Sequence, residues 1–337
     1  MLTFHIIYIK NSVYRFRYYL LSLLEHTDYN YRLVSNGCNL EENKILISLA
    51  NSDDRISYWR GPTSKVIDHG HILNMLQEMC KDEFFCFMDS DIFATSQIPD
   101  VLPILNKYKY KALFSCLPIW VKDDECTFRK KFKHLNGTYN QLEDGQCIGN
   151  TYWSIYHNDT LKEILQFYKI GFDPISSNKV FPYLVKQISR MGYTPKSFDT
   201  GKLINWIFIL KGIHIQNIEL KSLIHIGGVS FVIRKSKTIK VLERIKRANL
   251  KLILPLIHAF RYRNLAYSER VINYNQRVLH RDRIREHFLR LDYSLVHNHK
   301  APKIPPIKDN EINSRMTQIH KSYIEMFSKY NKRSISE

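Results

Sequence analysis

The sequence lacks the features that mark membrane-spanning, secreted or zinc-binding proteins. Its 337 residues contain no run of about 18 apolar residues, so we expect no transmembrane helix. The apolar residues 1–9 are followed by no cleavage site, and they predict a first strand rather than a signal peptide. Six cysteines are present, but none forms a C-x-x-C pair, so no zinc site is expected. Together these absences predict a cytoplasmic protein.

Positive charge is abundant but unevenly distributed. The net charge is +18, and residues 231–337 hold 24 Lys plus Arg against 9 Asp plus Glu, which leaves only about +3 for the first 230 residues. We therefore predict two units, a catalytic domain over residues 1–231 and a basic, mainly helical C-terminal extension over residues 232–337. An excess of basic residues next to a nearly neutral body is typical of a segment that docks on an anionic surface or on the acceptor.

The first 120 residues alternate between strand-like and helix-like patterns. The pattern predicts strands at 5–9 and 31–37 and helices at 13–26 and 70–79, and it leaves 44–50 and 55–59 open between strand and short helix. Such an alternation favours an α/β fold with a doubly wound, mostly parallel sheet.

The later part of the chain is patterned less regularly. Residues 122–145 are polar and charged, and we expect them to form a long loop on the active face. Further predicted elements are strands at 148–156 and 213–218 and helices at 161–168, 181–191, 203–211 and 312–330.

The most informative segment is the apolar run 84–88, which ends in Asp89 and Asp91. A run with three aromatic residues predicts a buried strand, and carboxylates are costly there unless they are paired or bind a metal. A strand of an open α/β sheet places its last residues at the edge where ligands bind. Paired carboxylates at such an edge suit a hard divalent cation, which in turn can hold a diphosphate.

These motifs resemble the GT-A glycosyltransferases, nearest in style to family 2. In that family an Asp-x-Asp motif binds Mn²⁺ or Mg²⁺, and Asp89-Ser90-Asp91 matches it. The resemblance implies that Asp89 also binds the nucleotide-sugar donor. The family often has an Ala-x-Asn helix near the nucleotide, and this chain offers only the Asn, Asn74. A polar residue ends the second strand near the base, and Asn36 occupies that place. The resemblance covers roughly residues 1–230.

The resemblance also implies residues on the acceptor side. A glycine-led strand follows Asp-x-Asp in the family, and the segment from Gly149 matches it. The acidic residue that serves as catalytic base corresponds by order to Asp199, although a Glu-Asp pair is commoner in the family; the pair Glu143-Asp144 precedes the glycine strand and ranks lower. A metal-binding histidine often follows, and His225 before Gly227-Gly228 fits.

By this resemblance the chain would be a metal-dependent hexosyltransferase that moves a sugar from a nucleotide-diphosphate donor to a glycan or lipid-linked acceptor, as in polysaccharide biosynthesis. The metal would neutralise the diphosphate leaving group. Asp199 would accept the proton of the acceptor hydroxyl if the enzyme inverts configuration. The two glycines would let the backbone turn close to the phosphate. The basic extension would hold the enzyme at the cytoplasmic face of an anionic membrane.

Simpler roles for the same residues stay open. Asp199 is also placed to cap the helix that begins near residue 202, and His225 could be an ordinary turn residue. Asn36 and Asn74 are residue types common in turns and on the polar face of helices.

Two other functions compete with the transferase. The basic extension alone would suit a non-enzymatic protein that binds anionic surfaces or nucleic acid, although no recognisable nucleic-acid motif is present. A haloacid-dehalogenase-like phosphatase also carries a strand followed by Asp-x-Asp. That family has Thr or Val two residues after the second Asp, where this chain has Phe93.

Overall fold

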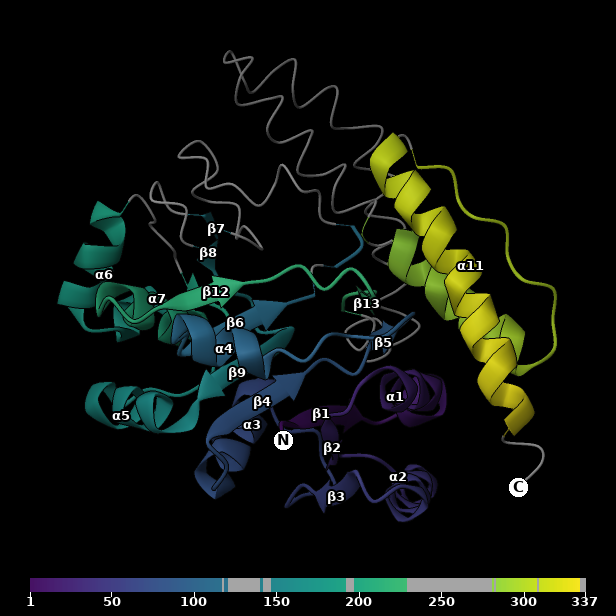
Figure 1. Ribbon diagram of the computed structural model, residues 1–337, viewed down its shortest axis with the longest axis horizontal. Helices are drawn as coiled ribbons and strands as arrows, with labels where there is room; N and C mark the ends of the chain where they lie inside the picture. Colours follow the sequence, from purple (N-terminus) through teal and green to yellow (C-terminus); the bar gives the residue numbers. More distant parts are fainter. Residues whose placement is uncertain are drawn as a thin grey trace.

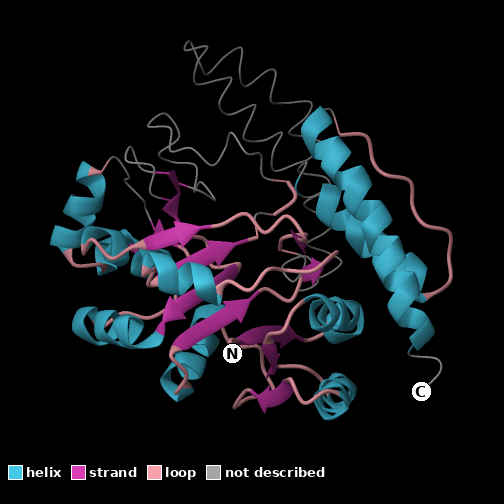
Figure 2. Ribbon diagram, in the orientation of Figure 1, coloured by secondary structure: helices cyan, strands magenta, loops and turns pink. Residues whose placement is uncertain are grey.

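The computed structural model describes residues 1–116, 118–120, 140–141, 147–191, 197–228, 281, 283–307 and 309–333. Within them, a central sheet is covered by helices on both faces (Figures 1 and 2). No helix among these residues is long and apolar enough to cross a membrane.

The sheet has seven strands in the order β12-β6-β9-β4-β1-β2-β3. Their bounds are β1 (Thr3–Ile9), β2 (Asn30–Asn36), β3 (Ile56–Arg60), β4 (Phe84–Met88), β6 (Ala112–Ser115), β9 (Trp153–His157) and β12 (Ile215–Asn217). β4, β1, β2 and β3 pair in parallel, as do β12 and β6, whereas β9 is antiparallel to both β4 and β6. The predicted α/β fold with a mostly parallel sheet is confirmed.

Side chains alternate between the two faces of the sheet and build two cores. On β4, Cys86 and Met88 join the core that also contains α1 (Val13–His26), whereas Phe85 and Phe87 join the core on the opposite face. The helices of the second core include α3 (His69–Met79), α5 (Asn158–Tyr168), α6 (Pro182–Arg190) and α7 (Lys202–Leu210). This two-sided burial explains why the β4 sequence is apolar without interruption.

The structure settles the two segments that the sequence left open. Residues 44–50 belong to the helix α2 (Leu40–Ser52), and residues 55–59 belong largely to β3. A capping box begins α2: the Glu42 amide donates to Asn39 Oδ1 at 2.9 Å, and the Asn39 amide donates to Glu42 Oε2 at 3.2 Å. The apolar pattern alone does not distinguish a short helix from a strand, whereas this cap does.

Short elements are the main addition to the predicted list. They are β5 (Ile92–Ala94), α4 (Leu102–Tyr108), β7 (Asn140–Gln141), β8 (Cys147–Ile148), β10 (Ile175–Ser176), the 3₁₀ turn η3 (Ser177–Lys179), β11 (Ser197–Phe198) and β13 (Leu223–His225). The predicted strand 148–156 is shorter than expected, because Gly149 to Tyr152 form a turn ahead of β9. Most of the predicted loop 122–145 lies outside the described residues.

The C-terminal helix pair, residues 283–296 and α11 (Asn310–Arg333), packs on the N-terminal half of the chain (Figure 1). Tyr323 of α11 lies edge-on to Tyr19 of α1, and Phe327 lies edge-on to Tyr18, with ring centroids 5.7 and 4.7 Å apart. The helix pair also contributes Ile284, Phe288, Leu291, Ile312, Met316, Ile319, Tyr323, Met326, Phe327 and Tyr330 to the core that contains α1. The described part of the basic extension is therefore an integral layer of the fold.

Candidate metal and donor site

The carboxyl end of β4 presents Asp89 and Asp91 at one edge of the sheet. The Asp89 amide donates to the Tyr152 carbonyl at 2.7 Å, which fixes the chain as it leaves the strand. The Asp91 side chain is buried, whereas 26% of the Asp89 side chain is exposed. One carboxylate is therefore held inside the protein and the other remains accessible to a ligand.

A second, two-stranded sheet brings His225 to the same place. β13 pairs antiparallel with β5, and in that register His225 stands opposite Ile92, next to Asp91. The Ile226 amide donates to the Asp91 carbonyl at 3.2 Å, which secures the pairing beyond the last strand residue. Asp89, Asp91 and His225, the candidate metal ligands that we call the metal triad, are thus brought together from segments far apart in the sequence.

The geometry of the metal triad suits a bound cation. His225 Nε2 lies 3.2 Å from Asp91 Oδ1 and 3.4 Å from Asp89 Oδ2, and one ligand atom from each residue lies within 4.8 Å of the others. His225 Nδ1 lies 3.0 Å from the Cys116 carbonyl, which can only accept, so Nδ1 carries the hydrogen and Nε2 is left to accept a metal. Nε2 is fully buried and has no hydrogen bond of acceptable geometry within the described residues.

The electrostatics of the metal triad favour positive charge at its centre. Burial alone lowers the pKa of His225, but the nearby carboxylates, Asp91 and then Asp89, outweigh it and raise the pKa to about 10. Without a metal, the imidazolium therefore balances the two carboxylates. A divalent cation fits this site because it can take the place of that proton and accept two oxygen ligands and one nitrogen ligand.

Asp199, the predicted base, lies in the turn between β11 and α7, and its side chain is exposed. Its Oδ1 accepts a hydrogen bond from the Thr200 amide at 2.9 Å. The predicted capping role is wrong, since Gly201 is the N-cap of α7 and no side chain caps that helix.

Tyr152 lies beside His225 of the metal triad. Its ring centroid lies 4.6 Å from that of His225. Burial raises the pKa of Tyr152, and the charges of Asp89 and Asp199 raise it further. The charges of Asp199 and of the two carboxylates therefore act on the same hydroxyl group.

Asn36 ends β2, as predicted, but its amide is engaged with the chain itself. Nδ2 donates to the Ile67 carbonyl and Oδ1 accepts from the Ile67 amide, both at 2.8 Å. The side chain therefore clamps the segment that leads from β3 into α3. Its assignment to the nucleotide stays a prediction that nothing in this geometry favours.

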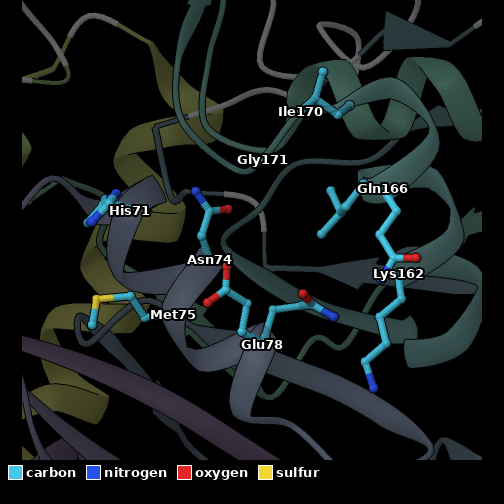
Figure 3. A pocket seen from close by; sticks show the side chains of 10 residues that line it. His71, Asn74, Met75, Glu78, Lys162, Gln166, Ile170 and Gly171 are labelled. Atoms are coloured by element: carbon cyan, nitrogen blue, oxygen red, sulfur yellow. The ribbon is translucent and has the colours of Figure 1, made fainter.

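Asn74 also holds a loop in place. Its Oδ1 accepts from the Phe172 amide at 2.7 Å, and its Nδ2 donates to Asp173 Oδ2 at 2.6 Å. It lines a cavity of about 590 Å³ between α3 and α5, together with Glu78, Lys162 and other residues of the two helices (Figure 3). With both amide atoms engaged, Asn74 supports the loop that follows α5, and its nucleotide role likewise stays a prediction.

Lys202 is a buried residue of this region that sequence reasoning missed. Its Nζ donates to Asn150 Oδ1 at 2.7 Å, in the turn that precedes β9. Burial lowers the pKa of Lys202 to about 8, and the Asp199 carboxylate partly offsets the shift. A signal was present in the sequence, because the helix that Lys202 opens is apolar except for Asn205, and such a helix is buried on all sides. The pair Glu143-Asp144, the lower-ranked candidate for the catalytic base, lies outside the described residues.

No protein-family model and no curated protein matches the chain in sequence. Among solved structures, it is similar to a mannosyltransferase from Pyrobaculum calidifontis in complex with GDP-Man and Mn²⁺, with 10% identity, a TM-score of 0.41, and 97% of this chain and 84% of that chain covered. It is also similar to residues 1–349 of S. aureus TarS in complex with UDP, with 12% identity, a TM-score of 0.40, and 98% and 92% covered. A third is the galactosyltransferase LgtC in complex with donor and acceptor sugar analogs, with 9% identity, a TM-score of 0.39, and 64% and 73% covered. Similarities this weak do not decide the function, which is inferred below from the geometry of the site.

Proposed function

We propose that this chain is a metal-dependent glycosyltransferase of the GT-A type that uses a nucleotide-diphosphate sugar as donor. The observation that carries the proposal is the metal triad at the edge of a mostly parallel sheet, with a fully buried imidazole nitrogen aimed at two carboxylates. This edge is the place where open α/β sheets bind ligands. The similarity to solved glycosyltransferases is compatible with the proposal but too weak to add to it.

Mn²⁺ is the metal we propose, in preference to Mg²⁺. Asp89 and Asp91 supply oxygen ligands that both ions accept. His225 adds a nitrogen ligand, whereas Mg²⁺ is usually bound through oxygen and keeps several waters. When bound, the ion supplies positive charge against the diphosphate of the leaving group.

The side chains of the site have different roles in donor binding and proton transfer. Asp89, the more accessible carboxylate, faces the donor, while the buried Asp91 and His225 hold their positions through their backbone contacts. In a direct displacement at the sugar, the exposed Asp199 accepts the proton of the acceptor hydroxyl. The new glycosidic bond forms as the bond between the sugar and the diphosphate breaks, and the nucleoside diphosphate leaves. Lys202, buried three residues further along the chain, adds a cation near Asp199.

The acceptor that we propose is a glycan or a lipid-linked sugar, consistent with the basic extension. The surplus of Lys and Arg over residues 231–337 supports association with an anionic membrane at its cytoplasmic face. Vesicle flotation tests this part of the proposal: the protein should float with vesicles rich in anionic lipid and stay behind with neutral ones. Equal flotation with anionic and with neutral vesicles would contradict a role of the basic residues in membrane association.

A thermal-shift panel of nucleoside diphosphates, each with and without Mn²⁺, tests the proposed function. Selective binding stabilises the folded state by mass action, so one nucleotide should raise the melting temperature only when Mn²⁺ is present. A shift that is independent of Mn²⁺, or stabilisation by all nucleotides alike, would contradict the proposal.

A further inference from the structure

Arg285, in the helical residues 283–296, reaches the turn that follows His225. Its Nε donates to the Gly227 carbonyl at 2.5 Å, and the side chain is buried. Gly228 lies so close that a Cβ on it would stand 2.1 Å from Arg285 Nη2, and its φ of +70° also favours glycine. In this structure the glycine pair therefore makes room for a guanidinium, which differs from the phosphate contact that the sequence suggested.

Trp120 holds the other side of the same turn. The segment 118–120 runs beside β13, since Pro118 bridges to His225 and the Ile119 amide donates to the His225 carbonyl at 3.0 Å. The guanidinium carbon of Arg285 lies 5.6 Å from the Trp120 ring centroid, in cation–π contact. A Cβ on Gly227 would stand 2.8 Å from Pro118 Cβ, so no side chain fits there either.

The helix that carries Arg285 is itself fixed to the body of the protein. Asp292, two turns further along the same helix, forms an ion pair with Arg15 of α1 at 2.7 Å and accepts from the Tyr323 hydroxyl at 3.1 Å. On the same helix, Ile284, Phe288 and Leu291 are buried in the core. The position of Arg285 is therefore determined by contacts to α1 and α11 rather than by the metal site.

We propose that Arg285 is a positioning residue for the metal triad: by holding the Gly227–Gly228 turn against Trp120, it keeps the His225 imidazole aimed at Asp89 and Asp91. The C-terminal helix pair thereby completes a metal site whose ligands all lie in the first 230 residues. This inference rests on the metal assignment of the proposed function.

Mn²⁺ alone is the probe that tests it, with free Mn²⁺ measured by electron paramagnetic resonance during titration. Loss of a group that orients a metal ligand typically weakens metal affinity about 10- to 100-fold, and we expect this for Arg285→Gln. Arg285→Lys should recover part of the affinity, because it can still donate to the Gly227 carbonyl. The matched control is Arg290→Gln on the exposed face of the same helix, which should leave Mn²⁺ affinity unchanged.

A double-mutant cycle separates positioning from a general loss of stability. Gly228→Ala should weaken Mn²⁺ binding in the native background, because the new Cβ displaces the guanidinium. In an Arg285→Ala background the same change should cost clearly less, since the collision is gone. Gly228→Ala in the native background stays informative even if variants of Arg285 fold poorly, because it leaves the guanidinium in the chain.

The outcomes distinguish the inference from the function on which it rests. Normal Mn²⁺ affinity in Arg285→Gln and in Gly228→Ala, with affinity lost in Asp91→Asn, would overturn the inference alone. Mn²⁺ affinity that survives in Asp91→Asn would overturn the metal assignment itself. Additive effects of Gly228→Ala and Arg285→Ala would also contradict the positioning role.

Discussion

The two halves of the metal triad reach the site by different routes. Asp89 and Asp91 come from one strand, and the apolar sequence of β4 is enough to place them at the sheet edge. His225 arrives through the pairing of β13 with β5, and its turn is held by Trp120 and Arg285. The first half is built by local sequence, whereas the second depends on tertiary contacts that extend to the C-terminal helix pair. Changes in the C-terminal helix pair should therefore displace His225 while they leave Asp89 and Asp91 in place.

The largest effect should follow from removal of α11. Deleting residues 310–337 would expose the core faces of α1 and of helix 283–296, and each large buried side chain contributes about 3–5 kcal/mol. Because a domain is stable by only about 5–15 kcal/mol, we expect the shortened chain to lose its fold. Circular dichroism and limited proteolysis measure this, with deletion of residues 334–337 as the control. A folded product would show that the helix pair is a separable extension.

Asp91→Asn should remove metal binding while the fold is retained. The side chain keeps its size but loses the charge that attracts the cation, and we expect Mn²⁺ affinity to fall by more than about 100-fold, beyond the effect of losing an orienting group. Asp28→Asn is a matched control, since Asp28 is exposed on the protein surface. Equal Mn²⁺ affinity in the two variants would contradict the role of the β4 carboxylates.

Asp199→Asn should affect transfer without affecting the metal. Loss of a general base typically costs about 10²- to 10⁴-fold in rate, while Mn²⁺ and nucleotide affinity should stay normal. Transfer from the nucleotide sugar identified by the thermal-shift panel is the activity to follow, beside Mn²⁺ titration. If turnover is retained, the base is another carboxylate, such as Asp173 or Glu143.

Lys202→Met should change how stability depends on pH. The pKa of Lys202 is lowered to about 8 in the folded protein, against 10.5 for an ordinary lysine, so the unfolded chain binds more protons between these values. The free energy of unfolding of the native protein should therefore gain about 3 kcal/mol from this residue as the pH rises from 8 to 10.5. Lys202→Met lacks that gain, which urea unfolding at several pH values would detect. Parallel pH curves for both proteins would contradict the lowered pKa of Lys202.

The β4 carboxylates could be predicted from the sequence, whereas the contacts that position His225 could not. The apolar run 84–88 predicts the buried strand, and the two aspartates after it predict the carboxylates at its end. Both predictions are possible because the pattern of apolar and charged residues is a local property of the chain. His225 could be proposed only from the resemblance, since strand pairing between distant segments leaves no local signature. Arg285 was hidden among many basic residues, and nothing in its own segment indicates that it is buried against Gly228. The resemblance alone places Asn36 and Asn74 near the nucleotide, and the hydrogen bonds that engage them cannot be seen in the sequence.

The central claim is that Asp89, Asp91 and His225 hold a metal that binds a nucleotide diphosphate. The most direct test is calorimetric titration of the nucleoside diphosphate selected by the thermal-shift panel into the native protein and into Asp91→Asn, each with and without Mn²⁺. The account predicts binding only for the native protein with Mn²⁺ present. Binding of similar strength in Asp91→Asn, or in the native protein without a metal, would contradict it.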